Sequence, residues 1–129
     1  MKKVVTFGEV MVRLAPSEHY RFTQACPGSM DLTFGGAESS VAASISILGG
    51  SSRFVSALPQ HAIADAFVSQ MRGFKVDVDH VLRREAGRFG IYYVETGANQ
   101  RPSRVIYDRD YSAVSICPGE EYDLSLIHI

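Results

Sequence analysis

The chain has 129 residues, enough for one domain, and 46% of them are hydrophobic and 21% charged. This composition is typical of a folded globular protein and excludes an intrinsically disordered one. Thirteen basic residues balance fourteen acidic ones, and the formal net charge of -1 argues against a wholly basic nucleic-acid binder. Cys26 and Cys117 lie far apart, and no apolar run approaches the roughly 20 residues that cross a bilayer. We therefore expect a cytoplasmic protein without a disulfide scaffold or a membrane segment.

The first part of the chain alternates strand and helix patterns. Residues 4–7 form a short apolar run closed by Gly8, which predicts a buried strand, and residues 10–14 predict a second one. The next elements, in chain order, are a strand at about 32–35, a helix at 37–48, a strand at 53–58 and a helix at 61–73. This order of strands and helices predicts an α/β fold with a parallel sheet.

The second part predicts an antiparallel insert. Residues 88–96 and 103–109 are rich in β-branched and aromatic residues, and turn-forming residues separate them, so we expect a hairpin. A further short strand is expected at 112–116. If Gly97 opposes Pro102, the numbers of opposed residues sum to 199, which sets the register of the hairpin.

In that register Tyr92 opposes Tyr107 and Gly90 opposes Arg109, so one face carries both phenols and the guanidinium. The other face carries Ile91, Tyr93 and Ile106. Two phenols and an arginine can hold a polyhydroxylated carboxylic acid, because arginine binds a carboxylate bidentately and phenols hydrogen-bond hydroxyls. An ordinary amphipathic hairpin surface would show the same pattern, so both interpretations stay open on periodicity alone.

Gly35 and Gly36 precede the helix at 37–48. Glycines let backbone N–H groups come close to a ligand, and the first turn of a helix offers unpaired donors to hydroxyl or anionic oxygens. A tight loop entering a helix is the alternative reading of this dipeptide. The pair belongs to neither a GxGxxG nor a Walker A pattern.

Other polar groups give weaker signals. Arginines concentrate late in the chain, at Arg83, Arg84, Arg88, Arg101, Arg104 and Arg109. A nucleic-acid patch is conceivable there, but solvated turns explain the cluster better because the whole chain is nearly neutral. The histidines show no metal-ligand spacing, so we expect no metal site. Ser39 and Ser40 fall in the first turns of a helix, where capping or packing is expected.

Several segments together resemble the N-terminal half of ribokinase-like (PfkB-type) carbohydrate kinases. They are VVTFGE at 4–9, FGGAE at 34–38 with its helix ending in LGG, RFGIYY at 88–93 and QRPSRVIYDR at 100–109. The last two are similar to the 2-keto-3-deoxygluconate kinase branch. The resemblance runs from residue 1 to about residue 119.

The resemblance implies an α/β sandwich with a β lid over the sugar site. Residues 1–123 would be the N-terminal part of the kinase domain and 124–129 an atypical tail. The implied lid strands lie at about 10–14, 32–35, 88–96 and 103–116. The implied reaction moves the γ-phosphate of ATP, with Mg²⁺, to 2-dehydro-3-deoxy-D-gluconate and gives the 6-phosphate.

The resemblance also assigns expected binding residues and partners. Gly35 and Gly36 would meet the sugar acid through the backbone, and Tyr92, Tyr107 and Arg109 would hold it from the lid. A homodimer through the lid is implied as well. No nucleic-acid or membrane partner is expected.

The sequence departs from the family pattern in two ways. Ser40 stands where the family helix usually has Asn, and its shorter side chain lacks the reach of an amide. No Gly-x-Gly-Asp segment occurs, so we expect the ATP-binding C-terminal half and its catalytic base to be absent. This chain alone would then bind neither ATP nor Mg²⁺ and would not catalyse. The alternatives are a fructokinase- or ribokinase-like fragment and a non-catalytic module that dimerises through the lid.

Overall fold

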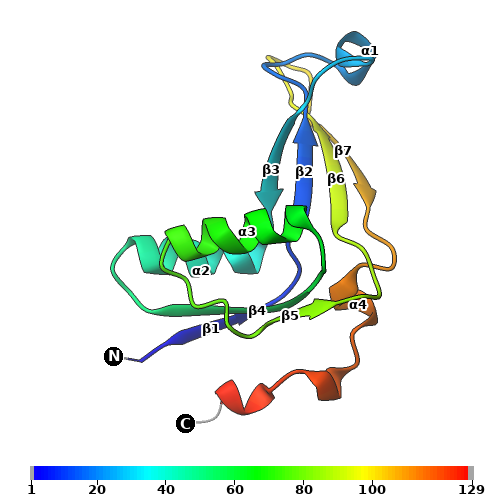
Figure 1. Cartoon of the computed structure of the whole chain (residues 1–129). Helices are drawn as coiled ribbons and strands as arrows, with labels where there is room; N and C mark the ends of the chain where they lie inside the picture. Colours follow the sequence, from blue (N-terminus) through cyan, green and yellow to red (C-terminus); the bar gives the residue numbers. More distant parts are fainter. Residues whose placement is uncertain (1, 128–129) are drawn as a thin grey trace.

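The strands form two separate sheets, a parallel one in the body and a second one that stands on it as a lid (Figure 1). The computed structural model describes residues 2–127. The body sheet has the order β1-β4-β5 and consists of β1 (Val4–Phe7), β4 (Ser52–Pro59) and β5 (Val81–Arg84). The lid sheet has the order β3-β2-β6-β7 and consists of β2 (Met11–Ala15), β3 (Asp31–Gly35), β6 (Gly90–Glu95) and β7 (Arg104–Asp108). The expected α/β fold with a β lid is confirmed.

Alternation along β4 explains why the body has helices on both sides of its sheet. Phe54 and Leu58 point into one cluster, with the helices α2 (Ala37–Ile47) and α3 (Ala62–Gly73). Val55 and Ala57 point into the other cluster, with α4 (Ala113–Ile116) and the ring of Tyr122. Because successive side chains of a strand face opposite ways, a central strand buried on both faces needs a covering layer on each side. The expected helices at 37–48 and 61–73 are confirmed to within a residue.

The lid was expected to be antiparallel, and this expectation is only partly right. β2 pairs with β3, and β6 with β7, in antiparallel fashion, but β2 and β6 run parallel to each other. The reason lies in the body: β2 follows β1 and β6 follows β5, and both leave the same end of a parallel sheet (Figure 1). The first strands of the two hairpins, β2 and β6, are neighbours in the lid and both rise from that end, so they run parallel.

The expected strand at 112–116, part of the expected lid strand 103–116, is wrong. β7 ends at Asp108, and after a turn at Tyr111, whose φ is 57°, the chain enters the short helix α4. The Ser112 hydroxyl accepts a hydrogen bond from the Ser115 N–H at 3.4 Å and so caps that helix. An apolar run this short fits a strand or a helical turn equally well, and the cap decides.

Two regular elements and two turns lay outside the sequence expectations. β5 carries two arginines in four residues and shows little apolar pattern, and the helix α1 (Phe22–Ala25) is a single turn at the lid tip. The short 3₁₀ turns η1 (Gly119–Glu121) and η2 (Leu124–Ile127) follow α4. Leu126 packs against the cluster of Val55 and Ala57. The rest of the expected atypical tail, residues 128 and 129, lies outside the described residues.

An aromatic cluster fixes the lid to the body. Phe67 of α3 packs edge-on against Phe34 of β3 at 5.4 Å between ring centroids and against Phe54 of β4 at 5.8 Å. Phe89, just before β6, lies 5.9 Å from Phe34. The rings therefore connect both lid hairpins to the body core, and the lid stands at a defined angle above the body.

In the described part of the chain, no helix is long and apolar enough to span a membrane.

Candidate functional site

The β6–β7 hairpin has the register expected from its turn. Tyr92 pairs with Tyr107 and Tyr93 with Ile106, so the opposed numbers sum to 199 as predicted. The rings of Tyr92 and Tyr107 lie 6.1 Å apart between centroids. The ladder itself stops at Ile91, but a Cβ added to Gly90 would lie 3.3 Å from the Arg109 Cβ, so these two residues also lie side by side.

Tyr92 is aimed at the double-glycine bend. A Cβ built on Gly35 would lie 2.1 Å from the Tyr92 hydroxyl, so that hydroxyl occupies the space a side chain would need. A Cβ on Gly36 would lie 2.6 Å from the carbonyl oxygen of Glu9. A side chain at Gly36 would meet backbone atoms, and one at Gly35 would displace the Tyr92 side chain. Close approach and not φ is the reason at Gly36, which is extended with a φ of 179°.

Gly36 is also the N-cap of α2, which leaves the first backbone N–H groups of that helix beside the bend. The Ser39 hydroxyl donates a hydrogen bond back to the Gly36 carbonyl at 3.0 Å and is buried. The expected capping or packing role of Ser39 is confirmed. Ser40 is exposed, and its backbone N–H donates to the same carbonyl at 3.0 Å.

Arg109 does not point freely into solvent, because its Nη2 donates to a carboxylate oxygen of Glu9. Glu9 lies in the connection between β1 and β2, and its side chain is 13% exposed against 46% for Arg109. Sequence reasoning missed Glu9. Its only signal was its place in the VVTFGE segment, because nothing in the spacing links residues so far apart.

Arg88 holds the turn that carries Arg109. Its Nη2 donates to the Asp108 carboxylate at 2.5 Å and its Nε to the Asp110 carbonyl at 2.6 Å, so it binds the residue on each side of Arg109. This hydrogen bond from Arg88 lowers the pKa of the Asp108 carboxyl. The backbone N–H of Arg88 also donates to the Tyr111 carbonyl at 3.0 Å. Arg88 is therefore a structural partner of the site.

The other clustered arginines are mostly engaged as well. Arg83 pairs with Asp65, Arg84 pairs with Glu121, and Arg101 donates to the Thr96 carbonyl at 3.1 Å. The expectation that solvated turns explain the cluster is wrong for Arg83 and Arg84, because both lie on β5, whereas Arg101 does lie in the hairpin turn. Guanidinium groups already paired in this way also leave little free charge for a nucleic acid.

The structure adds Arg13 to the tyrosine face. In the lid ladder Arg13 of β2 pairs with Tyr92 on one side and with Thr33 of β3 on the other. Cα partners in a ladder share a face, so a row of Thr33, Arg13, Tyr92 and Tyr107 crosses the whole lid. Sequence reasoning missed Arg13, because only the tertiary fold brings β2 beside β6.

The assembled site offers two phenols, a half-exposed guanidinium and the first N–H groups of a helix. Such a set can bind hydroxyls and a carboxylate, and it contains no nucleophile paired with a base. Among residues 2–127, no three His, Cys, Asp or Glu side chains gather as a metal site.

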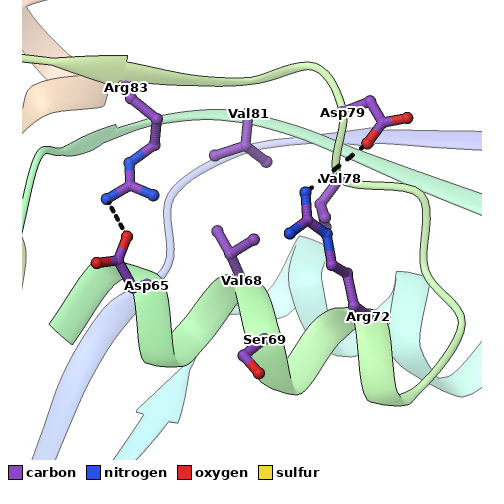
Figure 2. Close-up of a pocket in the computed structure, with 8 residues that line it drawn as sticks. All are labelled: Asp65, Val68, Ser69, Arg72, Val78, Asp79, Val81 and Arg83. Carbon is purple, nitrogen blue, oxygen red and sulfur yellow. Dashed lines mark ion pairs between the residues drawn. The ribbon is translucent and has the colours of Figure 1, made fainter. Parts of the chain in front are cut away.

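A cavity of about 280 Å³ lies elsewhere, between α3 and β5 (Figure 2). Two ion pairs border it: Arg83 Nη2 lies 2.8 Å from Asp65 Oδ1, and Arg72 Nη2 lies 3.9 Å from Asp79 Oδ1. Valine side chains form the floor between them. None of the residues at the glycine bend or on the tyrosine face lines this cavity, and its charges are mutually compensated.

Comparison with known proteins identifies the family. The model of the pfkB family of carbohydrate kinases matches residues 1–124. The chain is similar to a 2-dehydro-3-deoxygalactonokinase of Haloferax volcanii, with 36% identity over 125 residues that cover 97% of this chain and 38% of that protein. Among solved structures, a 2-dehydro-3-deoxygluconokinase of Thermotoga maritima has 45% identity and a TM-score of 0.91, covering 97% of this chain and 37% of that one.

A PfkB family carbohydrate kinase of Listeria grayi has 33% identity and a TM-score of 0.90, covering 98% of this chain and 39% of that one. The chain thus spans well under half the length of the relatives it matches. The fold, the position of the lid and the family match agree with one another. This chain belongs to the pfkB family of carbohydrate kinases.

Proposed function

We propose that the chain is the sugar-acid-binding part of a kinase that transfers the γ-phosphate of ATP to 2-dehydro-3-deoxy-D-gluconate and forms the 6-phosphate and ADP. One observation carries the proposal: Tyr92, Tyr107 and Arg109 share a face of the lid, and the Tyr92 hydroxyl on that face lies against Gly35. The names of two relatives, a 2-dehydro-3-deoxygluconokinase and a 2-dehydro-3-deoxygalactonokinase, support a sugar acid of this class.

The role of this chain in that reaction is binding and orientation. Arg109 has donors left over from its contact with Glu9 and can take the substrate carboxylate in a bidentate manner. The phenols of Tyr92 and Tyr107 hydrogen-bond substrate hydroxyls, and the backbone at Gly36 meets the sugar from the body side. Bound ATP with Mg²⁺ would supply the phosphoryl group and the charge that stabilises its transfer. The sequence of this chain contains no Gly-x-Gly-Asp segment to provide a base.

An NMR titration of the chain with 2-dehydro-3-deoxygluconate, and separately with fructose, tests the proposal. Arg109→Ala should weaken binding of the sugar acid by about 10- to 100-fold, as expected for a hydrogen-bonded charge pair, and fructose by less than about twofold. Arg104→Ala is the matched control, because Arg104 is an exposed residue of β7, the strand that Arg109 follows, and lies on the opposite face of the hairpin. Equal losses for both sugars would favour a fructokinase- or ribokinase-like enzyme instead.

A lid-mediated homodimer is part of the proposal, and the outer surface of the lid favours it. Near the tip an apolar hollow of about 310 Å³ is lined by Phe22, Cys26, Met30, Tyr93 and Ile106. Ile106 is 54% exposed and borders this apolar hollow, so the exposed apolar surface is a patch and not a single residue. A second copy presenting the same lid would cover this surface through a two-fold contact.

Sedimentation analysis of wild type and Ile106→Glu tests the dimer. We expect twice the chain mass for wild type and the single chain mass for the variant, with binding of the sugar acid retained because Ile106 lies on the other face from Tyr107. A monomeric wild type would contradict the dimer, and a dimer without sugar binding would favour a pure dimerisation module.

A cytoplasmic location also belongs to the proposal, supported by the two free cysteines, Cys26 and Cys117.

A further inference from the structure

We propose that Glu9 is a positioning residue for Arg109: it holds the guanidinium at the glycine bend before the substrate arrives. The inference rests on the proposed function, since it names a residue that prepares that same site for a carboxylate. It starts from the contact between the Arg109 Nη2 and a Glu9 carboxylate oxygen. No feature of the hairpin itself fixes where the end of the Arg109 side chain lies.

The two partners differ in how firmly each is held. The Glu9 side chain is 13% exposed and lies against Gly90, whereas Arg109 is 46% exposed on the turn after β7. The backbone of Glu9 is held as well, because its carbonyl oxygen lies against Gly36. A long exposed arginine has many rotamers, and contact with a fixed carboxylate removes most of them. The buried acid is therefore the anchor and the exposed arginine the anchored group.

Gly90 makes room for this arrangement. A Cβ on Gly90 would lie 2.6 Å from Glu9 Oε1 and 3.3 Å from the Arg109 Cβ, so the missing side chain of Gly90 is replaced in space by the Glu9 carboxylate. Oε1 is buried and finds no hydrogen-bond partner within residues 2–127. Burying an unpaired carboxylate oxygen costs stability, so stability alone does not explain why Glu9 is placed here.

The contact leaves Arg109 able to bind. A guanidinium carries five N–H donors, and the link to Glu9 runs through Nη2. The remaining donors belong to a half-exposed side chain on the face of Tyr92 and Tyr107, where a substrate carboxylate would approach. An arginine oriented in advance loses less conformational entropy on binding. The contact between Glu9 and Arg109 should therefore raise the affinity for the sugar acid more than the affinity for a neutral sugar.

Side-chain NMR relaxation of the Arg109 Nε–H in the sugar-free chain is the first test, and it needs no ligand. We expect a restricted Nε–H in wild type and a mobile one in Glu9→Gln and in Gly90→Ala, whose methyl group would displace the Glu9 carboxylate. Glu120→Gln is the control, because it removes the same charge from an exposed position on η1. A mobile Arg109 in wild type, or one still restricted in Glu9→Gln, would overturn the inference.

Binding is the second test. Glu9→Gln should lower the affinity for 2-dehydro-3-deoxygluconate by about 5- to 30-fold and the affinity for fructose by less than about twofold. In an Arg109→Ala background, Glu9→Gln should not lower the affinity for the sugar acid any further. If Glu9 had only a general structural role, it would lower the affinity in that background as well. Tighter binding in Glu9→Gln would show that Glu9 competes with the substrate, and equal losses for both sugars would show a structural role; either result overturns the inference.

The two proposals fail in different ways. If Arg109→Ala leaves the affinity for the sugar acid unchanged, the proposed function is wrong whatever the relaxation data show. If Arg109→Ala weakens the sugar acid while Glu9→Gln changes neither relaxation nor affinity, the function stands and the positioning role of Glu9 is wrong.

Discussion

The body and the lid use apolar residues in different ways. In β4 of the body almost every position is buried, and Phe54 is fully enclosed by helices. In β7 of the lid most positions are exposed, and Tyr107 is 61% exposed although it is a large aromatic residue. Packing therefore accounts for the residues of β4. It does not account for the exposed Tyr107, which the proposed function places against the substrate.

The boundary between the two regions is the ring cluster of Phe34, Phe54, Phe67 and Phe89. It belongs to both regions, because it takes side chains from the lid root and from the body core. The lid, whose edge strand β7 is mostly exposed, is thus held firmly at its base. The comparison predicts that stability depends on the base and the body, and binding on the exposed lid face.

The largest expected effect is at the ring cluster. Phe67→Ala should lower the free energy of unfolding by about 3–5 kcal/mol, because it leaves a cavity between the lid root and the body. Tyr107→Ala, on the exposed face, should lower it by less than about 1 kcal/mol. Urea unfolding followed by circular dichroism measures both. Similar losses would mean that the lid face is part of the folding core.

The next effect is at Gly87, in the connection between β5 of the body and β6 of the lid. Its φ is +90°, and an added Cβ would lie 2.5 Å from the Ala113 Cα, so Gly87→Ala should cost about 2–4 kcal/mol. Gly49→Ala is the matched control: its φ is +88° with no heavy atom within 4 Å of the added Cβ, and about 1 kcal/mol is expected. Thermal unfolding separates the two, and equal costs would show that the connection yields to the methyl group.

The smallest effect is at Asp77, which joins β1 and β4 within the body. Its carboxylate accepts hydrogen bonds from Lys3 Nζ at 2.7 Å and Arg53 Nε at 2.8 Å. Burial alone would raise the pKa of Asp77, but these hydrogen bonds outweigh it and hold the pKa well below the ordinary value of 3.8. Asp77→Asn should therefore cost about 1–2 kcal/mol at pH 7.

The pH dependence gives the sign of this contribution. Because the pKa of Asp77 is lowered in the folded state, its stabilisation is present above the unfolded pKa and is lost as the pH falls through the folded pKa. Wild type and Asp77→Asn should thus converge in unfolding free energy below about pH 4. Asp79→Asn serves as the control, with an 81% exposed side chain and an expected change under about 0.5 kcal/mol. A difference that stays constant down to pH 2 would contradict this account.

Local patterns in the sequence were enough for much of the fold. The helices of the body and the strand between them follow from apolar spacing and flanking glycines, since burial of one face imposes a period. The register of the β6–β7 hairpin follows from its short turn and from period 2. The prediction of a strand at 112–116 was wrong, because so short a segment shows no period that separates a strand from a helical turn.

The residues of the candidate site also fall into two groups, those predicted from local sequence patterns and those that only the structure revealed. Gly35, Gly36, Tyr92, Tyr107 and Arg109 were found from the sequence, because they lie on a single hairpin or at a single helix start. Their role in binding the sugar acid stays a prediction. Glu9 and Arg13 were not found, because each meets its partner only across distant segments.

The sequence by itself determined the α/β class, the body helices and which residues share a face of the hairpin, since these depend on neighbours a few residues away. The tertiary structure alone decided that β2 lies parallel to β6, that Glu9 contacts Arg109, and that the Tyr92 hydroxyl lies against Gly35. Those contacts depend on how the parallel body strands direct both hairpins upward and on the ring cluster that fixes their angle. Packing of the whole body determines these contacts, so the periodicity of a single segment cannot predict them.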